Sequence, residues 1–242
     1  MNIFGLSDVG RVRENNEDNC RFEKLNDRQA IFVVCDGMGG ALAGETASCV
    51  ASSVFIEQLR GYIKEKMNLR YMESTLTNAV RFANYDTYNK ANSDPQFYGM
   101  GTTLVGGIYH EGKVILANIG DSRAYLLDEN GLRRLTRDHS LVEELVIRGE
   151  ITEDEARHHP RKNVITRAMG PDRNPKPDIY PFSMEPGQKL LLCSDGLSNM
   201  LEEDVLAEIL AEENLEKICE SLVRAANENG GTDNITVLVL TA

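Results

Sequence analysis

Apolar residues along this chain fall into short dense runs and into longer stretches with helical spacing. The dense runs are rich in Val, Ile and Leu, a composition typical of strands, and they cover residues 30–34, 102–109, 113–119, 124–127, 189–193 and 235–240. Apolar residues at intervals of three and four, which predict helices, occupy residues 45–63, 73–92, 203–212 and 215–229. The pattern therefore predicts a protein that contains both helices and strands.

The order of these elements favours one fold class. Two long helices lie together, several strands follow, and further helices precede a final strand, which fits an α+β protein better than a regular βαβ alternation. Only His110, Glu111 and Gly112 separate the strands at 102–109 and 113–119, so an antiparallel hairpin is expected there. We predict antiparallel sheets covered by helices, in a single domain of residues 1–242.

Residues 141–186 differ in composition from the rest of the chain. Prolines from Pro160 to Pro181 and many charged residues crowd this stretch, where connections between elements are expected. Because proline interrupts regular structure, we predict a surface insertion, or flap, over about 141–186.

Composition narrows the class of protein without changing the predicted fold. Apolar residues make up 41% and charged residues 26% of the chain, which is ordinary for a folded globular protein. The formal charge of −12 argues against a nucleic-acid partner, since phosphate backbones are bound by clustered Lys and Arg. The five cysteines show no CxxC spacing, so neither a disulfide framework nor a cysteine zinc site is suggested. The sequence shows no basic leader and no apolar run of about 18 residues, so we expect a cytoplasmic protein without a membrane partner.

Three apolar runs end in an aspartate that has a glycine as its neighbour. Glycine beside the acid lets the backbone turn tightly and brings a carbonyl group or an ion close. Further acids lie just before the last run and early in the chain. The acids concerned are Asp36, Asp121, Asp195, Asp233, Glu17 and Asp18.

These acids would repel one another strongly if they converged. Hard divalent cations with oxygen ligands are the simplest remedy, and Mg²⁺ or Mn²⁺ is favoured over zinc because no Cys/His set accompanies the acids. A single Asp-Gly pair is more often an ordinary turn. Its repetition at the ends of apolar runs favours metal binding.

Phosphate chemistry follows from such a centre. Two ions that share a carboxylate can hold a bridging water, lower its pKa and aim it at a phosphorus atom, which predicts phosphoester hydrolysis without a covalent intermediate. Arg13 is the candidate for gripping the phosphate, although a lone arginine is more often a solvated surface charge. His139 either assists substrate protonation or caps and packs a turn, and the structural role is favoured.

Taken together, these motifs resemble those of the type-2C metal-dependent protein phosphatases, the PPM family, particularly its compact bacterial members. The resemblance spans nearly the whole chain. It rests on residues 13–18, 34–40, 44–45, 100–103, 118–123, 136–140, 167–170, 194–197 and 230–236.

The resemblance implies a four-layer α-β-β-α sandwich, with two central antiparallel sheets between helix pairs and a metal site in the cleft at the sheet edges. It implies that Asp36 bridges two Mn²⁺ or Mg²⁺ ions and that the backbone carbonyl of Gly37 completes the coordination of one of these ions. Asp195 and Asp233 are expected to serve the other ion.

Other positions match the family less directly. Glu17 or Asp18 is expected to act through bound water. Of the two, Asp18 is assigned to the metal set, whereas Glu17 and Asn234 are assigned to the surroundings of the ligands.

The resemblance also implies a third, weaker ion in some family members, for which Asp121 and Asp195 match the ligand positions. Arg13 matches the phosphate-binding arginine. The stretch at about 141–186 resembles the family's flap, which lies beside the active site and influences substrate choice.

One departure separates this chain from eukaryotic relatives, which usually have histidine in the Asp-Gly-x-Gly-Gly motif as a proposed general acid. The position is Met38 here, and methionine cannot donate a proton. Bacterial members commonly share this methionine, so leaving-group protonation is expected from metal-bound water or another residue.

The leading interpretation is metal-dependent hydrolysis of phosphoserine and phosphothreonine in proteins, opposing a cytoplasmic bacterial Ser/Thr kinase. The kinase and its substrates are the expected partners of a monomeric enzyme. A pseudophosphatase that only binds phosphoproteins is the alternative from another class, and a phosphatase for an anti-sigma-factor antagonist is a narrower one. A metal-dependent nuclease is disfavoured by the −12 charge and the lack of a basic stripe.

Overall fold

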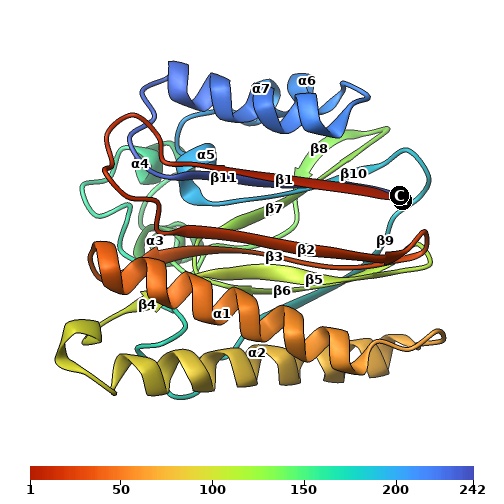
Figure 1. Cartoon of the computed structure of the whole chain (residues 1–242). Coiled ribbons are helices and arrows are strands. Elements are labelled where there is room, and N and C mark those ends of the chain that lie inside the picture. The colour runs from red at the N-terminus through yellow and green to blue at the C-terminus, as the bar shows by residue number, and fades with distance from the viewer.

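The computed structural model describes residues 1–242, with the exception of the Ala41 side chain. The layers follow one another as helices, sheet, sheet and helices from the bottom to the top of Figure 1. The strands of both sheets pair in antiparallel fashion. This arrangement confirms the predicted α-β-β-α sandwich.

The two sheets differ in strand number and order. The six-stranded sheet has the order β2-β3-β5-β6-β9, with the short β4 paired to β3, and the five-stranded sheet has the order β1-β11-β10-β7-β8. The strands of the six-stranded sheet are β2 (Asp18–Asn26), β3 (Gln29–Met38), β4 (Gly101–Thr102), β5 (Leu104–His110), β6 (Lys113–Ile119) and β9 (Asp178–Ser183). Those of the five-stranded sheet are β1 (Asn2–Asp8), β7 (Arg123–Asp128), β8 (Gly131–Arg134), β10 (Lys189–Cys193) and β11 (Ile235–Thr241).

Strand β3 shows why the central strands read as unbroken apolar runs. Ile31 and Val33 belong to the core beneath the helices, whereas Phe32 and Val34 belong to the core between the sheets. Side chains alternate between the two faces of a strand, and here both faces are buried. A strand covered on both sides therefore needs an apolar residue at nearly every position.

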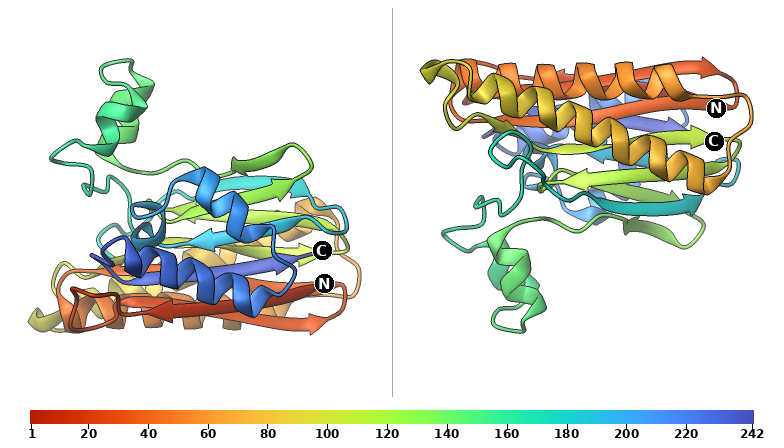
Figure 2. Two further views of the ribbon diagram at one scale, coloured as in Figure 1. Left: turned by 90° about the horizontal axis from the view of Figure 1, so that it is seen from above. Right: turned by 90° about the horizontal axis from the view of Figure 1, so that it is seen from below.

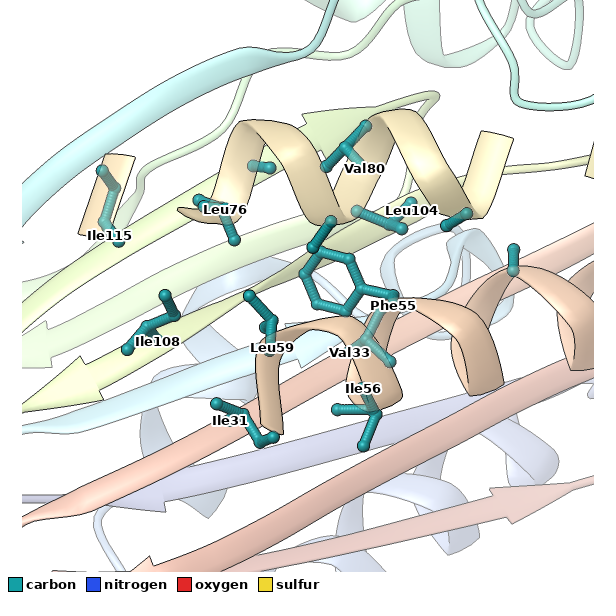
Figure 3. Packing of buried hydrophobic residues seen from close by; sticks show 14 of the residues in the cluster. Ile31, Val33, Phe55, Ile56, Leu59, Leu76, Val80, Leu104, Ile108 and Ile115 are labelled. Carbon is teal, nitrogen blue, oxygen red and sulfur yellow. The ribbon is translucent and has the colours of Figure 1, made fainter. Parts of the chain in front are cut away.

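Helices α1 (Ala41–Tyr62) and α2 (Leu69–Ala91) cover the outer face of the six-stranded sheet. Figure 3 shows Phe55 and Leu59 of α1 and Leu76 of α2 converging on one cluster with residues of β3 and β5. Helix α2 begins where the Asn68 side chain accepts the Tyr71 N–H at 2.9 Å, which satisfies a free donor of the first turn. The 3₁₀ helix η1 (Pro95–Phe97) follows α2 and leads the chain back to β4.

Helices α6 (Glu203–Leu210) and α7 (Leu215–Glu228) cover the outer face of the five-stranded sheet, and the short α5 (Asp195–Ser198) follows β10. The buried positions of α7 repeat at intervals of three and one, so they form a single stripe toward the sheet. These residues are Leu215, Ile218, Cys219, Leu222, Val223 and Ala226.

The flap carries two short helices, α3 (Leu141–Ile147) and α4 (Glu153–Arg157), and it projects from the body in both views of Figure 2. The segments that enter and leave the flap meet at its base, where Ser140 forms an isolated β-bridge with Ile165. The predicted insertion at 141–186 extends too far, because β9 lies inside it and pairs with β6 along the edge of the six-stranded sheet.

The runs at 30–34, 113–119, 189–193 and 235–240 and the four helical stretches coincide with observed elements. The predicted hairpin is confirmed, with His110 opposite Lys113 and positive φ angles at Glu111 (50°) and Gly112 (78°). Within the described residues, the helices lack the combination of length and apolar character that spanning a bilayer requires.

Candidate active site

Several chain segments deliver acids to one end of the sandwich, the left-hand end in Figure 1. Asp18 opens β2 and lies opposite Asp36, near the end of β3, in the antiparallel register. Asp195 follows β10, and Asp233 precedes β11. Both sheets therefore contribute to one acidic group, since the charges of Asp195 and Asp233 raise the pKa of Asp36.

Two glycines allow the acidic loops to approach the first turn of α1. A Cβ atom on Gly44 would overlap the Glu17 carboxylate, and one on Gly37 would lie 2.6 Å from the Glu17 backbone oxygen. At Gly37 the short contacts are with backbone atoms and exclude any side chain, whereas a Cβ on Gly44 would push the Glu17 carboxylate aside. Gly37 and Gly44 thus bring Glu17, the turn after Asp36 and the start of α1 together.

Asp18 is buried, with a side chain held in one orientation. The Ser194 hydroxyl donates to Asp18 Oδ2 at 2.7 Å and in turn accepts the Thr236 N–H at 3.0 Å. Burial raises the pKa of Asp18 to about 7, and the charges of Asp195 and Asp233 add to this effect.

Asp36 and Asp195 are partly accessible but crowded by protein and by other carboxylates. Desolvation raises the pKa of Asp36 well above its ordinary value, and the charge of Asp18 raises it further. Desolvation, followed by the charge of Asp233, raises the pKa of Asp195 to about 6. The backbone of Asp36 is fixed by Thr103, whose N–H donates to its carbonyl at 2.8 Å and whose hydroxyl accepts its N–H at 2.9 Å.

Asp121 has a buried oxygen, Oδ1, with no hydrogen-bond partner. The residue is 8% exposed, and burial together with the charges of Asp195 and Asp138 raises the pKa of its carboxyl well above the ordinary value. An unpartnered buried carboxylate oxygen is costly unless a proton or a cation satisfies it.

Asp233 pairs with Arg13, whose Nη2 lies 2.8 Å from Asp233 Oδ2. The neighbouring Asn234 organises the loop between β1 and β2: its Nδ2 donates to the Asn15 carbonyl at 2.9 Å and its Oδ1 accepts the Glu17 N–H at 2.8 Å. Asn234 therefore positions Glu17 through the backbone.

This donor set fits hard divalent cations. Its side chains offer oxygen ligands, and the raised pKa values indicate that the protein alone stabilises the negative charges poorly. Among the described residues, no three His, Cys, Asp or Glu side chains are already drawn together as a closed ligand set. Mg²⁺ needs no such set because it keeps several waters and uses one or two carboxylates at a site.

Comparison with known proteins decides the family. Residues 10–235 match the family described as protein phosphatase 2C. The chain belongs to the protein phosphatase 2C family.

Two relatives of this phosphatase illustrate the similarity in sequence. It is 41% identical to the serine/threonine phosphatase stp of Listeria monocytogenes, over 97% of this chain and 93% of that protein. It is 36% identical to the protein phosphatase PhpP of Streptococcus pneumoniae, over 99% of this chain and 97% of that protein.

Solved structures show the same fold. The serine/threonine phosphatase of S. agalactiae superposes with a TM-score of 0.91 at 33% identity, covering 100% of this phosphatase and 99% of that chain. The catalytic domain of PstP in complex with two manganese ions superposes with a TM-score of 0.83 at 33% identity, covering 98% and 96%.

A cavity of about 510 Å³ opens beside the acids of this phosphatase, between the flap and the start of α6. Asp121 and Asp195 line one side of it, and Arg157 and Lys162 of the flap line the other. Arg157 also forms an ion pair with Glu202, so the flap is tied to the body across the cavity.

Some site residues were not assigned a role from the sequence. Ser194 and Thr103 hold Asp18 and Asp36, although both belong to motifs that carry the resemblance to the family. Neither hydroxyl residue is adjacent in the sequence to the acid that it holds, so spacing gave no signal for these contacts. His139 is buried beside Gly120, a place that fits the structural role rather than substrate protonation.

Proposed function

We propose that this protein serine/threonine phosphatase hydrolyses phosphoserine and phosphothreonine at the acidic end of the sandwich, with two divalent cations, Mn²⁺ or Mg²⁺, held by its aspartates. When bound, such ions neutralise phosphate oxygens and lower the pKa of a water. The observation that carries the assignment is the convergence of carboxylates with raised pKa values from both sheets, beside the unpartnered oxygen of Asp121.

The roles of the residues follow from their places. Asp36 lies at the centre of the group and would be shared between two ions, with the Gly37 carbonyl beside it. Asp195 and Asp233 come from the other sheet and would hold the second ion. Asp18 is buried and fixed by Ser194, so it would act through water.

Arg13 would bind the substrate phosphate. Its side chain is 53% exposed, and only one of its terminal nitrogens contacts Asp233. A guanidinium with free donors at the rim of an acidic site can bind two phosphate oxygens bidentately and so fix the orientation of the phosphate.

Asp121 and Asp195 would hold a third ion. Both line the cavity beside the flap. Burial and then the charge of Asp195 raise the pKa of Asp121, and an ion there would offset both effects.

We further propose that the substrates are phosphorylated proteins, among them a Ser/Thr kinase of the same cell and its targets. The enzyme would work as a cytoplasmic monomer, with residues 1–242 as one catalytic domain. The −12 charge supports protein rather than nucleic-acid substrates.

Hydrolysis of a phosphothreonine peptide tests the proposal. Turnover should require Mn²⁺, stop in EDTA and fall at least about 100-fold in Asp36→Asn, because removing one ligand charge disrupts the shared site. Asp86→Asn, on the exposed face of α2, is the matched control and should keep full activity. Mn²⁺ binding without turnover on several phosphopeptides would instead indicate a protein that only binds phosphoproteins.

A further inference from the structure

His139 lies where the chain leaves the body to form the flap, against the turn that carries Asp121. We propose that His139 is a positioning residue that holds the Gly120–Asp121 turn for ion binding and ties this turn to the base of the flap. The inference rests on the proposed function, since it assigns Asp121 to an ion.

Both backbone polar groups of Gly120 form hydrogen bonds with His139. The Gly120 N–H donates to His139 Nδ1 at 3.1 Å, and the His139 N–H donates to the Gly120 carbonyl at 2.9 Å. Gly120 has φ of 105°, which side-chain-bearing residues rarely adopt, and a Cβ there would press on Thr103. The backbone entering Asp121 is therefore fixed in direction.

The other ring nitrogen faces the return of the chain from the flap. Because Nδ1 accepts a hydrogen bond, a neutral ring carries its proton on Nε2, which lies 3.3 Å from Asp178 Oδ2. Arg167 Nη1 is 2.9 Å from Nε2, but its two protons go to the Lys176 carbonyl at 2.7 Å and to Asp178 Oδ1 at 3.0 Å. A protonated Nε2 can donate to Asp178 and cannot accept from Arg167.

The flap closes on the same residue. The His139 carbonyl accepts the Thr166 N–H at 2.8 Å, and the next residue, Ser140, bridges to Ile165. A displacement of the flap base therefore moves His139, and with it the acceptor that holds Gly120. The ion at Asp121 is expected to respond to flap position, whereas Asp36 and its neighbours are anchored in other strands.

Two substitutions of His139 test the roles of its two ring nitrogens separately. Asn places an oxygen near the position of Nδ1, and Gln places an amide near that of Nε2. His139→Gln should weaken the weakest class of Mn²⁺ sites about 10-fold or more, the usual effect of losing a supporting contact, and His139→Asn should recover affinity to within about 3-fold. Calorimetric titration of the EDTA-treated protein with Mn²⁺ measures both, without reference to activity.

A double-mutant cycle identifies the route. In an Asp121→Asn background, His139→Gln should cause no further loss of Mn²⁺ affinity, because the residue acts through Asp121. An additional loss there, or equal weakening by Asn and Gln, would reduce His139 to a packing role and overturn the inference.

A measurement on the unaltered protein remains decisive if the variants fold poorly. Nitrogen-15 NMR should show Nδ1 as the unprotonated and Nε2 as the protonated ring nitrogen, with a Gly120 amide protected from hydrogen exchange. The opposite tautomer overturns the inference. If the wild type binds no Mn²⁺, the proposed function fails with it; if the wild type binds Mn²⁺ and both variants match it, only the role of His139 is refuted.

Discussion

Asp18 and Asp36 occupy directly opposed positions in the antiparallel pair of β2 and β3. Like charges at opposed positions of a sheet are destabilising, and burial raises the pKa of Asp18 to about 7. Neutral residues at these two positions of β2 and β3 would avoid the cost of this repulsion. This cost is expected if the position binds a cation, as proposed above, because a bound cation would offset the repulsion.

Asp18→Asn should stabilise the metal-free protein and weaken its response to metal. Removing a buried charge opposite Asp36 is expected to raise the free energy of unfolding at pH 8 by about 1 kcal/mol, and the amide oxygen can still accept from Ser194. Urea unfolding in EDTA and in Mn²⁺ measures both effects. A variant less stable than wild type in EDTA would contradict the repulsion argument.

The metal-free protein should lose stability as the pH rises from about 4 to about 7. The native pKa values of Asp18 and Asp195, about 7 and about 6, exceed the value of ~3.9 for an unfolded aspartate. The native state therefore binds more protons than the unfolded state in this window, and its stability falls as they leave. Unfolding at several pH values in EDTA tests this.

Stabilisation by added Mn²⁺ should grow over the same range of pH, because protons and cations compete for the same oxygens. Comparing unfolding midpoints with Mn²⁺ and with EDTA at each pH measures this difference. A difference that stays constant from pH 5 to pH 8 would show that these carboxylates do not bind the ion.

Gly44→Ala should abolish most activity, because the new methyl group would displace the Glu17 carboxylate from the first turn of α1. Gly61→Ala is the matched control in the same helix, where a Cβ meets nothing within 4 Å. The control should be as active as wild type and more stable by up to ~1 kcal/mol. Full activity in Gly44→Ala would show that Glu17 can move without consequence.

Arg13→Ala should raise KM for a phosphopeptide about 10-fold or more, the typical loss for a charge-assisted hydrogen bond. Mn²⁺ affinity should change little, since Arg13 is a neighbour of Asp233 and not a metal ligand. Arg11→Ala removes an exposed arginine of the same loop and serves as the control. An unchanged KM in Arg13→Ala would transfer the role of binding phosphate to another residue.

The sequence predicts best those parts of the fold that are buried on both faces. Strand β3 reads as an unbroken apolar run because cores lie on either side of it. Strand β9 was assigned to the flap because of Pro181, but it lies at the edge of its sheet, the position where a strand tolerates proline. Strand β1, another edge strand, is only partly buried and gives a weak pattern.

Four acids of the site, Asp36, Asp121, Asp195 and Asp233, were visible from the sequence because each lies next to or close to an end of a predicted strand. The contacts of these acids could not be predicted from the sequence. Arg13 and Asp233, for example, are separated by 220 positions and meet only when both sheets are complete. Nor could spacing reveal that Asp121 keeps an unpartnered oxygen, which depends on what surrounds it in three dimensions.

The place of β11 between β1 and β10 has a consequence for the synthesis of the protein. The first strand of the chain pairs with the last, and Asp233 joins the acidic group from the start of that last strand. A nascent chain that lacks β11 leaves β1 without a partner and the acidic group without one of its members. We therefore expect the nascent chain to become active only after β11 has emerged from the ribosome.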